Sequence, residues 1–150
     1  MLTVSDSRSE ADDTSGQHIE RTLTDAGHTV VLRRIVKDDP DQINDQLHRW
    51  IDDPKIDVIC CTGGTGVGRR DTTTDVVDRL LQKKLDGFGE LFRMLSWHQI
   101  GAAAMLSRAV AGLVGRTVIF VMPGSTKAVA LAMEKLILPE LPHLVWVMRC

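Results

Sequence analysis

The chain alternates short apolar segments with segments of helical period along its whole length, and this alternation limits the fold more than any other feature. Strands and helices that alternate in this way are typical of a layered α/β domain with a mostly parallel sheet. The expected strands are Met1–Val4, Thr29–Val36, Ile56–Cys61, Ala109–Leu113 and Thr117–Met122. The expected helices are Ser15–Ala26, one opened by Pro40, Thr74–Gln82, Phe88–His98, Ala102–Leu106 and Thr126–Leu138, the last ended by Pro139.

The segment Ile56–Cys61 is an unbroken apolar run, which indicates a strand in a sheet that is covered on both faces. Adjacent residues of a strand point to opposite faces, so Cys60 and Cys61 are expected to be small buried apolar groups. The third cysteine, Cys150, is far away in the sequence, and no disulfide framework is indicated. Unpaired cysteines favour a reducing compartment. We therefore expect a cytoplasmic protein.

Length and composition limit the function classes. The 150 residues correspond to one domain, residues 1–150, with 43% hydrophobic and 25% charged residues. A formal charge of −2 gives no electrostatic reason to expect a nucleic acid or an anionic membrane as partner. The sequence contains no signal-peptide pattern and no apolar run near 18 residues, so we expect neither secretion nor a membrane span. Because Met1–Val4 already has the pattern of a strand, we expect a few native residues before it.

The last third of the chain is poor in acidic residues. From Ala102 to Arg149 the only acids are Glu134 and Glu140. We expect this region to be buried in a core or in a subunit interface, and its apolar residues predict an oligomer. These residues are Leu141, Leu144, Val145, Trp146 and Val147.

Three expected strands end in small or glycine-rich segments: Ser5–Asp6, Thr62–Gly66 and Pro123–Ser125. In open α/β sheets, ligands bind beyond the carboxyl ends of the parallel strands. Glycines let backbone N–H groups approach an anion closely, and the helix N-termini that follow add partial positive charge. The three segments together predict a binding site for a phosphate or a carboxylate.

The glycine run does not match a common nucleotide motif. From Gly63, the phosphate-loop spacing leads to Gly68 and then to arginines in place of lysine, and the dinucleotide-binding spacing fails at Arg69. A tight strand-to-helix turn explains the glycines equally well. The next residues, Arg69, Arg70 and Asp71, favour a site, because two cations stand beside a carboxylate able to hold Mg²⁺.

The acidic residues also have a simpler interpretation. Asp71 precedes a helix, where an acidic residue is often only a cap or a partner of the helix dipole. Asp38 and Asp39 precede the helix opened by Pro40, and at least one of them is expected to be its cap. The five histidines are scattered without metal-ligand spacing, so no zinc site is predicted.

Seven short motifs occur together in this order: TVSDS near the start, DDTSG at 12–16, TGGTG at 62–66, RRD at 69–71, GFGE at 87–90, SRAVAG at 107–112 and MPGSTKA at 122–128. In these motifs the chain resembles the MogA/MoaB family of molybdenum cofactor biosynthesis proteins, and it is similar to the gephyrin G domain. The resemblance covers nearly the whole chain. It implies a three-layer α/β/α fold, mostly parallel with one antiparallel strand, assembled as a homo-trimer or hexamer.

The resemblance also implies ligands and residue roles. The ligands are molybdopterin and Mg²⁺ with ATP, or with another nucleotide. Asp71 and Asp38 would hold Mg²⁺ and align the reacting groups, and Glu90 and Ser125 would line the pterin side. The remaining binding residues, which include the phosphate-binding glycine run, are Ser5, Asp6, Gly63, Gly64, Thr65, Gly66, Pro123 and Gly124.

Two functions remain open under this resemblance. The RRD motif looks like that of MogA-like members, which adenylylate molybdopterin: its phosphate attacks the α-phosphorus of Mg-ATP and releases pyrophosphate. The compact length, with DDTSG, SRAVAG and MPGSTKA, looks MoaB-like and is also compatible with a carrier or scaffold that binds molybdopterin or a nucleotide without turnover.

Overall fold

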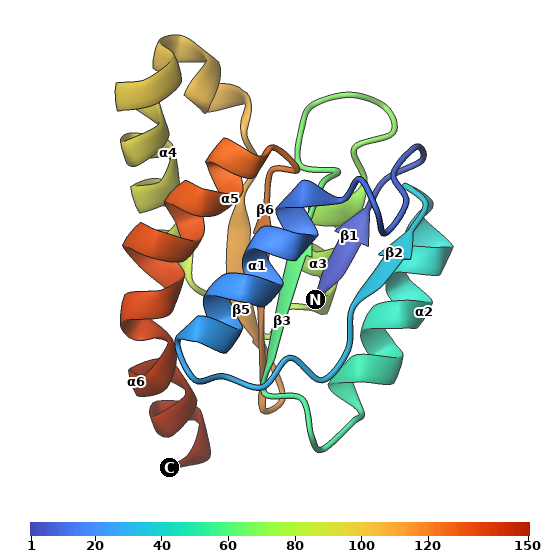
Figure 1. Ribbon diagram of the computed structural model, residues 1–150, viewed down its shortest axis with the longest axis vertical. Helices are drawn as coiled ribbons and strands as arrows, with labels where there is room; N and C mark the ends of the chain where they lie inside the picture. The colour runs from blue at the N-terminus through green and yellow to red at the C-terminus, as the bar shows by residue number, and fades with distance from the viewer.

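The computed structural model describes residues 1–150 and contains one sheet of six strands in the order β2-β1-β3-β6-β5-β4 (Figure 1). The strands are β1 (Leu2–Val4), β2 (Arg34–Val36), β3 (Val58–Thr62), β4 (Lys83–Lys84), β5 (Val110–Val114) and β6 (Thr117–Met122). Strands β2, β1, β3 and β6 are parallel, and β5 is antiparallel to both of its neighbours. The prediction of a mostly parallel sheet with one antiparallel strand is confirmed.

Helices cover both faces of this sheet, which makes three layers. The helices are α1 (Thr14–Asp25), α2 (Pro40–Ile51), α3 (Thr73–Leu80), α4 (Asp86–Ile100), α5 (Thr126–Ala132) and α6 (Leu138–Arg149), with a 3₁₀ helix η1 (Gly101–Leu106) and a π-helical turn η2 (Met133–Ile137). One face carries α1, α4, α5 and α6, and the other carries α2 and α3 (Figure 1). None of these helices has the length and apolar character needed to cross a membrane.

Each face of the sheet has its own apolar core, and the two adjacent cysteines divide between them. Cys60 packs in the core under α1, α4, α5 and α6, whereas Cys61 packs in the core under α2 and α3. Burial raises the pKa of Cys60 to about 11 and that of Cys61 to about 12. Both thiols therefore stay protonated at neutral pH, and the prediction that they are small buried apolar groups is confirmed.

The second strand is shorter than predicted. The pattern predicted a strand over Thr29–Val36, but only Arg34–Val36 is one. The reason lies in its neighbour: β2 pairs only with β1, and β1 supplies partners for only those three residues. Strand propensity alone cannot form a strand where no adjacent backbone is present.

The last helix is longer than predicted, and the prediction that Pro139 ends it was wrong. After α5, the π-helical turn η2 leads into α6, which continues to Arg149 with Pro142 in its interior. Pro139 lies in the first turn of α6, directly after the π-helical turn, so the residue without an N–H group stands where the helical hydrogen-bond pattern changes. Leu141, on the following turn, is buried in the core.

The loop after β1 is fixed by a buried carboxylate. The side chain of Asp13 is fully buried. It accepts hydrogen bonds from Thr3 Oγ1 at 2.7 Å and from the amide of Gly16 at 3.0 Å. It also forms ion pairs with Arg33 at 3.1 Å and with Arg8 at 3.4 Å. Burial alone would raise the pKa of Asp13, but the hydrogen bonds from Thr3, Gly16 and Arg33 outweigh it and hold this pKa below its ordinary value. Asp13 thus caps α1 and ties it to the sheet.

We predict that Asp13→Ala lowers the free energy of unfolding by about 3 kcal/mol, because two arginines and a buried hydroxyl lose their acceptor. Urea denaturation measures this change. Asp45→Ala, which removes an exposed carboxylate from α2, is the matched control and should change the free energy by no more than about 0.5 kcal/mol.

The effect of Asp13→Ala should also depend on pH. Because the pKa of Asp13 is lowered in the folded chain, the unfolded chain takes up the proton first as the pH falls, and acid removes the stabilisation. The difference in free energy of unfolding between the parent and Asp13→Ala should have its full value at neutral pH. It should shrink as the pH falls below 3.8, the ordinary pKa of an aspartate. A difference independent of pH would contradict this account.

Candidate functional site

The glycine loop after β3 lies between the ends of β1 and β6. The amide of Gly63 donates to the carbonyl of Met122 at 3.1 Å, and a Cβ atom on Gly63 would collide with the carbonyl oxygen of Val4. Gly63 has φ +91°, and Gly124 lies directly beside it, with its Cβ position 3.4 Å from the Gly63 Cα. The three predicted strand-end segments therefore meet at one edge of the sheet.

Gly64 brings this loop against the end of β2 and the start of α3. It has φ +65°, and a Cβ atom there would collide with Thr73 Oγ1 and lie 3.0 Å from Asp38 Oδ2. The space beside the Gly64 Cα is thus filled by protein atoms. The Thr73 hydroxyl is buried and has no hydrogen-bond partner.

In the glycine loop, the peptide carbonyls have hydrogen-bond partners within the protein, whereas three of the amides have none. The carbonyl of Thr65 accepts from the amide of Arg108 at 2.9 Å, the carbonyl of Gly66 accepts from Arg108 Nε at 2.8 Å, and that of Gly64 accepts from the amide of Thr74 at 3.5 Å. The amides of Gly64, Thr65 and Gly66 donate to no protein acceptor. Consecutive free amides in a glycine-rich turn form a site that favours an anion.

Asp38 connects the end of β2 to the start of α3. Its Oδ1 accepts from the amide of Thr72 at 3.2 Å and from Thr72 Oγ1 at 2.8 Å, while its own amide donates to Asp6 Oδ1 at 3.2 Å. Its neighbour Asp39 caps α2 by accepting from the amide of Gln42 at 3.0 Å. The prediction that at least one of the two aspartates is a cap is confirmed, for Asp39.

Asp71 is not the cap of α3. The residue at the cap position is Thr72, and the Oδ2 atom of Asp71 instead accepts from the amide of Gly68 at 2.8 Å. A Cβ atom on Gly66 or Gly68 would lie 2.7 Å from that oxygen, so both glycines are needed for the loop to close around it. Asp71 therefore shapes the loop that leads from the free amides to α3.

Each of the two carboxylates lies against one glycine of the loop: Asp38 Oδ2 is 3.0 Å from the Gly64 Cβ position, and Asp71 Oδ2 is 2.7 Å from the Gly66 Cβ position. Mg²⁺ in phosphate sites is usually held by one or two carboxylates together with phosphate oxygens, and this donor set fits that pattern. No group of three or more acidic, histidine or cysteine side chains is positioned to hold a metal by itself. A metal at this place would depend on oxygens from a ligand.

Two arginines that the sequence analysis did not select hold the loops in place. Arg108 also donates to the carbonyl of Asp71 at 2.6 Å and to Asp75 Oδ1 at 2.7 Å, so one side chain ties the glycine loop to α3. Arg8 donates to the carbonyl of Gly124 at 3.0 Å, which Ser15 Oγ also contacts at 2.6 Å. Arg108 lies in the SRAVAG motif, and Arg8 directly follows the TVSDS motif. Their positions in the sequence do not identify the carbonyl groups that they contact.

A cavity of about 1050 Å³ opens beside the loops, between α4 and α5. The loops contribute Thr65, Gly66, Pro123 and Ser125 to its wall, and α5 with η2 contributes two cations, Lys127 and Lys135. The remaining lining residues come from α4, from α5, from η2 and from the segment before β5, and the polar ones among them include Ser96, Gln99, Ser107 and Glu134. The buried hydroxyl of Ser107 has no hydrogen-bond partner.

Three predicted residues have other contacts. The hydroxyl of Ser5 accepts from the amides of Ser7 and Arg8 at 3.3 and 3.2 Å, and Asp6 pairs with Arg70 at 2.7 Å. Glu90 is exposed on α4, and it does not line the cavity. Its role beside a pterin stays a prediction, as do the roles of the other predicted site residues.

Comparisons with known proteins agree on one family. Residues 1–143 match the family model described as "Probable molybdopterin binding domain". Molybdenum cofactor biosynthesis protein B of Bacillus anthracis is 50% identical over 145 residues, which are 96% of this chain and 86% of the relative.

Two crystal structures have the same fold and related sequences. The crystal structure of a molybdenum cofactor biosynthesis protein B matches with a TM-score of 0.95 at 48% sequence identity. The match covers 99% of this chain and 92% of the chain in that structure. The tungsten cofactor synthesizing protein MoaB of Pyrococcus furiosus has a TM-score of 0.89 at 37% identity, over 99% and 94% of the two chains. With the shared motifs and the arrangement of the strand ends, these matches show that the chain belongs to the MogA/MoaB family of molybdenum cofactor biosynthesis proteins.

Proposed function

We propose that this protein binds molybdopterin and adenylylates it with Mg-ATP in the cytoplasm, releasing pyrophosphate. The observation that carries the proposal is the set of free amides at Gly64, Thr65 and Gly66, whose carbonyls are all engaged elsewhere. Family membership supports a role in molybdenum cofactor biosynthesis. The buried, protonated thiols of Cys60 and Cys61 are compatible with a reducing compartment.

In this proposal the free amides bind the terminal phosphate of molybdopterin, and the adjacent cavity takes the pterin. Lys127 and Lys135 on the cavity wall add positive charge. One phosphate oxygen of molybdopterin forms a bond to the α-phosphorus of ATP, while the bond from that phosphorus to the bridging oxygen breaks and pyrophosphate leaves. The chain contributes positioning and charge neutralisation, as in other phosphoryl-type transfers.

Asp38 and Asp71 are the residues that would hold Mg²⁺, which when bound neutralises the charge that builds up on the leaving pyrophosphate. Arg108 keeps Asp71 in place through its carbonyl, and the amide of Gly68 orients the Asp71 carboxylate. Each carboxylate already accepts hydrogen bonds from the protein, so its orientation is set before a ligand arrives.

A second function is favoured by one observation: both carboxylates also have structural partners, Thr72 for Asp38 and Gly68 for Asp71. If those contacts are their whole role, the protein binds molybdopterin or a nucleotide as a carrier or scaffold, without turnover. Incubation with molybdopterin and Mg-ATP, followed by analysis for adenylylated product, decides between the two functions.

We predict that Asp71→Asn lowers the rate of adenylylation by roughly a hundredfold or more and leaves molybdopterin binding nearly intact. Asparagine keeps an oxygen that accepts from the Gly68 amide, but it removes the charge that Mg²⁺ prefers. Single-turnover assays measure the rate, and thermal melts check the fold. Asp45→Asn is the matched control, because Asp45 is exposed on α2. Equal rates for parent and Asp71→Asn would contradict the catalytic role.

We predict that Gly64→Ala weakens molybdopterin binding at least tenfold and also lowers the melting temperature. The new side chain requires φ +65°, which L residues rarely adopt, and it collides with Thr73 Oγ1. Titration calorimetry and thermal melts measure the two effects. Gly87→Ala on α4 is the control, since its Cβ position meets nothing within 4 Å. Unchanged affinity in a folded Gly64→Ala variant would show that this loop does not bind the phosphate.

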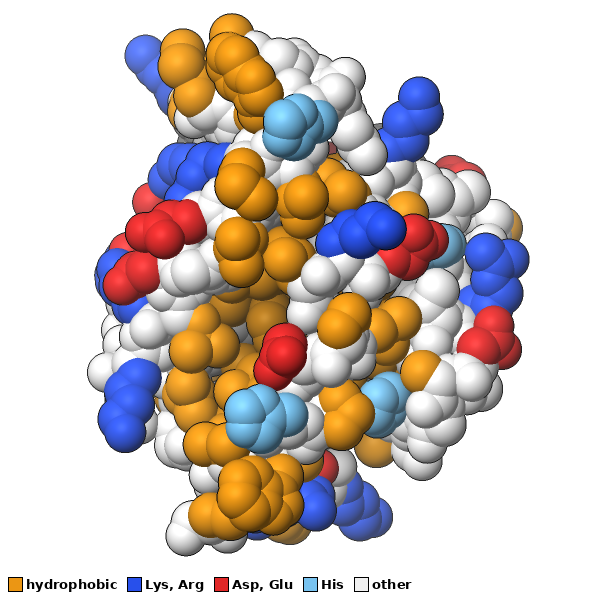
Figure 2. Space-filling model, turned by 90° about the vertical axis from the view of Figure 1, so that its left-hand side faces the viewer, with side chains coloured by type: hydrophobic (Ala, Val, Ile, Leu, Met, Phe, Trp, Pro, Cys, Tyr) orange, Lys and Arg blue, Asp and Glu red, His pale blue; other side chains and the backbone are white.

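We further propose that the chain forms a homo-oligomer through the face that carries α4, η1 and α6. Figure 2 shows apolar side chains running across this side of the molecule. Of the C-terminal apolar residues that were predicted to be buried in a core or in an interface, Leu141 is buried within the chain. Trp146 and Val147 are 65% and 49% exposed. The exposed apolar residues of α4 and η1 are Leu91, Met94, Trp97, Ile100, Met105 and Leu106.

We predict that native mass spectrometry at micromolar protein concentration finds a trimer or a hexamer. The double variant Trp97→Asp, Met105→Asp should be a monomer under the same conditions. These two side chains are 59% and 77% exposed, so charged replacements leave the core of the isolated chain intact but are unfavourable in an apolar interface. Arg79→Asp on α3, on the other face of the sheet, is the control. Monomers alone in the parent protein would exclude the proposal.

A further inference from the structure

The cavity between α4 and α5 has a single acidic side chain on its wall, that of Glu134. Two lysines, Lys127 and Lys135, line the same cavity, but neither pairs with it, because Lys84 is the only lysine of the chain that forms an ion pair. The Glu134 carboxylate therefore has no cation beside it, and its oxygens are available to a ligand.

The backbone around Glu134 has an unusual geometry. Glu134 lies in the π-helical turn η2, and two other residues of this turn, Met133 and Ile137, are buried in the core. These buried neighbours anchor the turn, so that Glu134 and Lys135 face the cavity from a fixed backbone. Single π-helical turns of this kind occur frequently at functional sites.

The other side of the cavity supplies polar groups from α4 and from the segment before β5. Ser96 is only 5% exposed, and Gln99 lies on the next turn of the same helix. The hydroxyl of Ser107 is buried without a hydrogen-bond partner, and Phe92 adds an apolar surface. Few polar groups on a partly apolar wall are typical of a site that orients a flat ring by the donors and acceptors on its edge.

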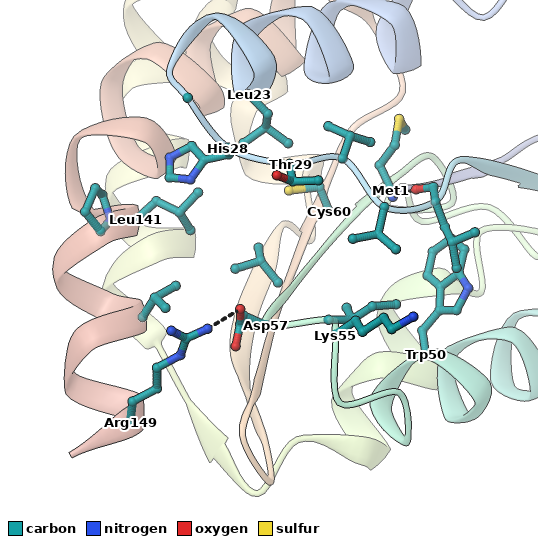
Figure 3. Close-up of a pocket in the computed structure, with 18 residues that line it drawn as sticks. Met1, Leu23, His28, Thr29, Trp50, Lys55, Asp57, Cys60, Leu141 and Arg149 are labelled. Carbon is teal, nitrogen blue, oxygen red and sulfur yellow. Dashed lines mark hydrogen bonds and ion pairs between the residues drawn. The ribbon is translucent and has the colours of Figure 1, made fainter.

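The smaller cavity of the molecule, of about 400 Å³, lies where β3 begins and has no free carboxylate (Figure 3). The one acidic side chain on its wall, Asp57, is already paired with Arg149 at 2.7 Å. Of the two cavities, only the one beside the glycine loop thus offers an acidic group that a ligand can use.

We propose that Glu134 selects the pterin ring of the substrate by accepting hydrogen bonds from its N3–H and its 2-amino group. The inference rests on the proposed function, which places a pterin in this cavity. In a 2-amino-4-oxopyrimidine ring these donors are parallel, as in a guanidinium group, and they match the two oxygens of a carboxylate. Glu134 takes the place predicted for Glu90, which does not line the cavity.

The test compares two rings without phosphate that differ at one group. The probes are 6-hydroxymethylpterin and 6-hydroxymethyllumazine, in which an oxo group replaces the 2-amino group. The parent protein should bind the pterin more tightly by about tenfold or more, because the oxo group removes one charge-assisted hydrogen bond and faces the carboxylate. Fluorescence titration measures both dissociation constants.

Glu134→Gln should weaken pterin binding by about tenfold or more and leave lumazine binding nearly unchanged, so that the discrimination disappears. Unchanged lumazine binding shows that the cavity is intact. Glu140→Gln is the matched control, because Glu140 is exposed on α6 and does not line this cavity. Equal affinity of the parent for both rings, or no binding of either, would overturn the proposal, as would loss of the discrimination in Glu90→Gln in place of Glu134→Gln.

The guanine base of a nucleotide presents the same pair of donors, and a guanosine titration separates the two sources. The pterin should bind more tightly than guanosine, and tighter binding of guanosine that depends on Glu134 would overturn the assignment to the pterin. None of these titrations needs ATP, Mg²⁺ or a phosphate. Discrimination without adenylylated product would therefore contradict only the proposed reaction, and product without discrimination would contradict only the role of Glu134.

Discussion

The close approach of the Gly63–Gly64 backbone to the ends of β1 and β6 is the contact on which the candidate site depends. Gly63 lies so near the Val4 carbonyl that no side chain fits, and its amide is held by Met122. This contact fixes where the chain turns after β3. It also brings the segment after β6 alongside, so that loops distant in sequence share one edge of the sheet.

Around this contact, two arginines bind backbone carbonyl groups, and the amides of the glycine loop are left without partners. Arg108 binds the carbonyls of Gly66 and Asp71, and Arg8 binds that of Gly124. A guanidinium group has several donors in fixed directions and no acceptor, so it orients carbonyls without occupying the amide donors that an anion would need. The loop amides at Gly64, Thr65 and Gly66 are then available to a phosphate at no cost in broken protein contacts.

The two ends of the parallel strands have different physical character. At the carboxyl ends, polar loops and free amides surround a cavity with lysines on its wall. At the amino ends, a smaller cavity has a mostly apolar lining. The first arrangement favours a charged small molecule, because free amides and lysines supply donors and positive charge.

The sequence by itself determined the layered fold, the positions of most elements and the three strand-end segments, because period, apolar runs and glycines are local signals. It did not determine the length of β2 or the course of the chain past Pro139, since the first depends on the neighbour β1 and the second on a π-helical turn. The motifs identified the family, but only the tertiary structure decided which backbone groups are satisfied. Arg108 is far in sequence from the carbonyls that it binds, and hydrogen bonds across such separations follow from how the layers pack.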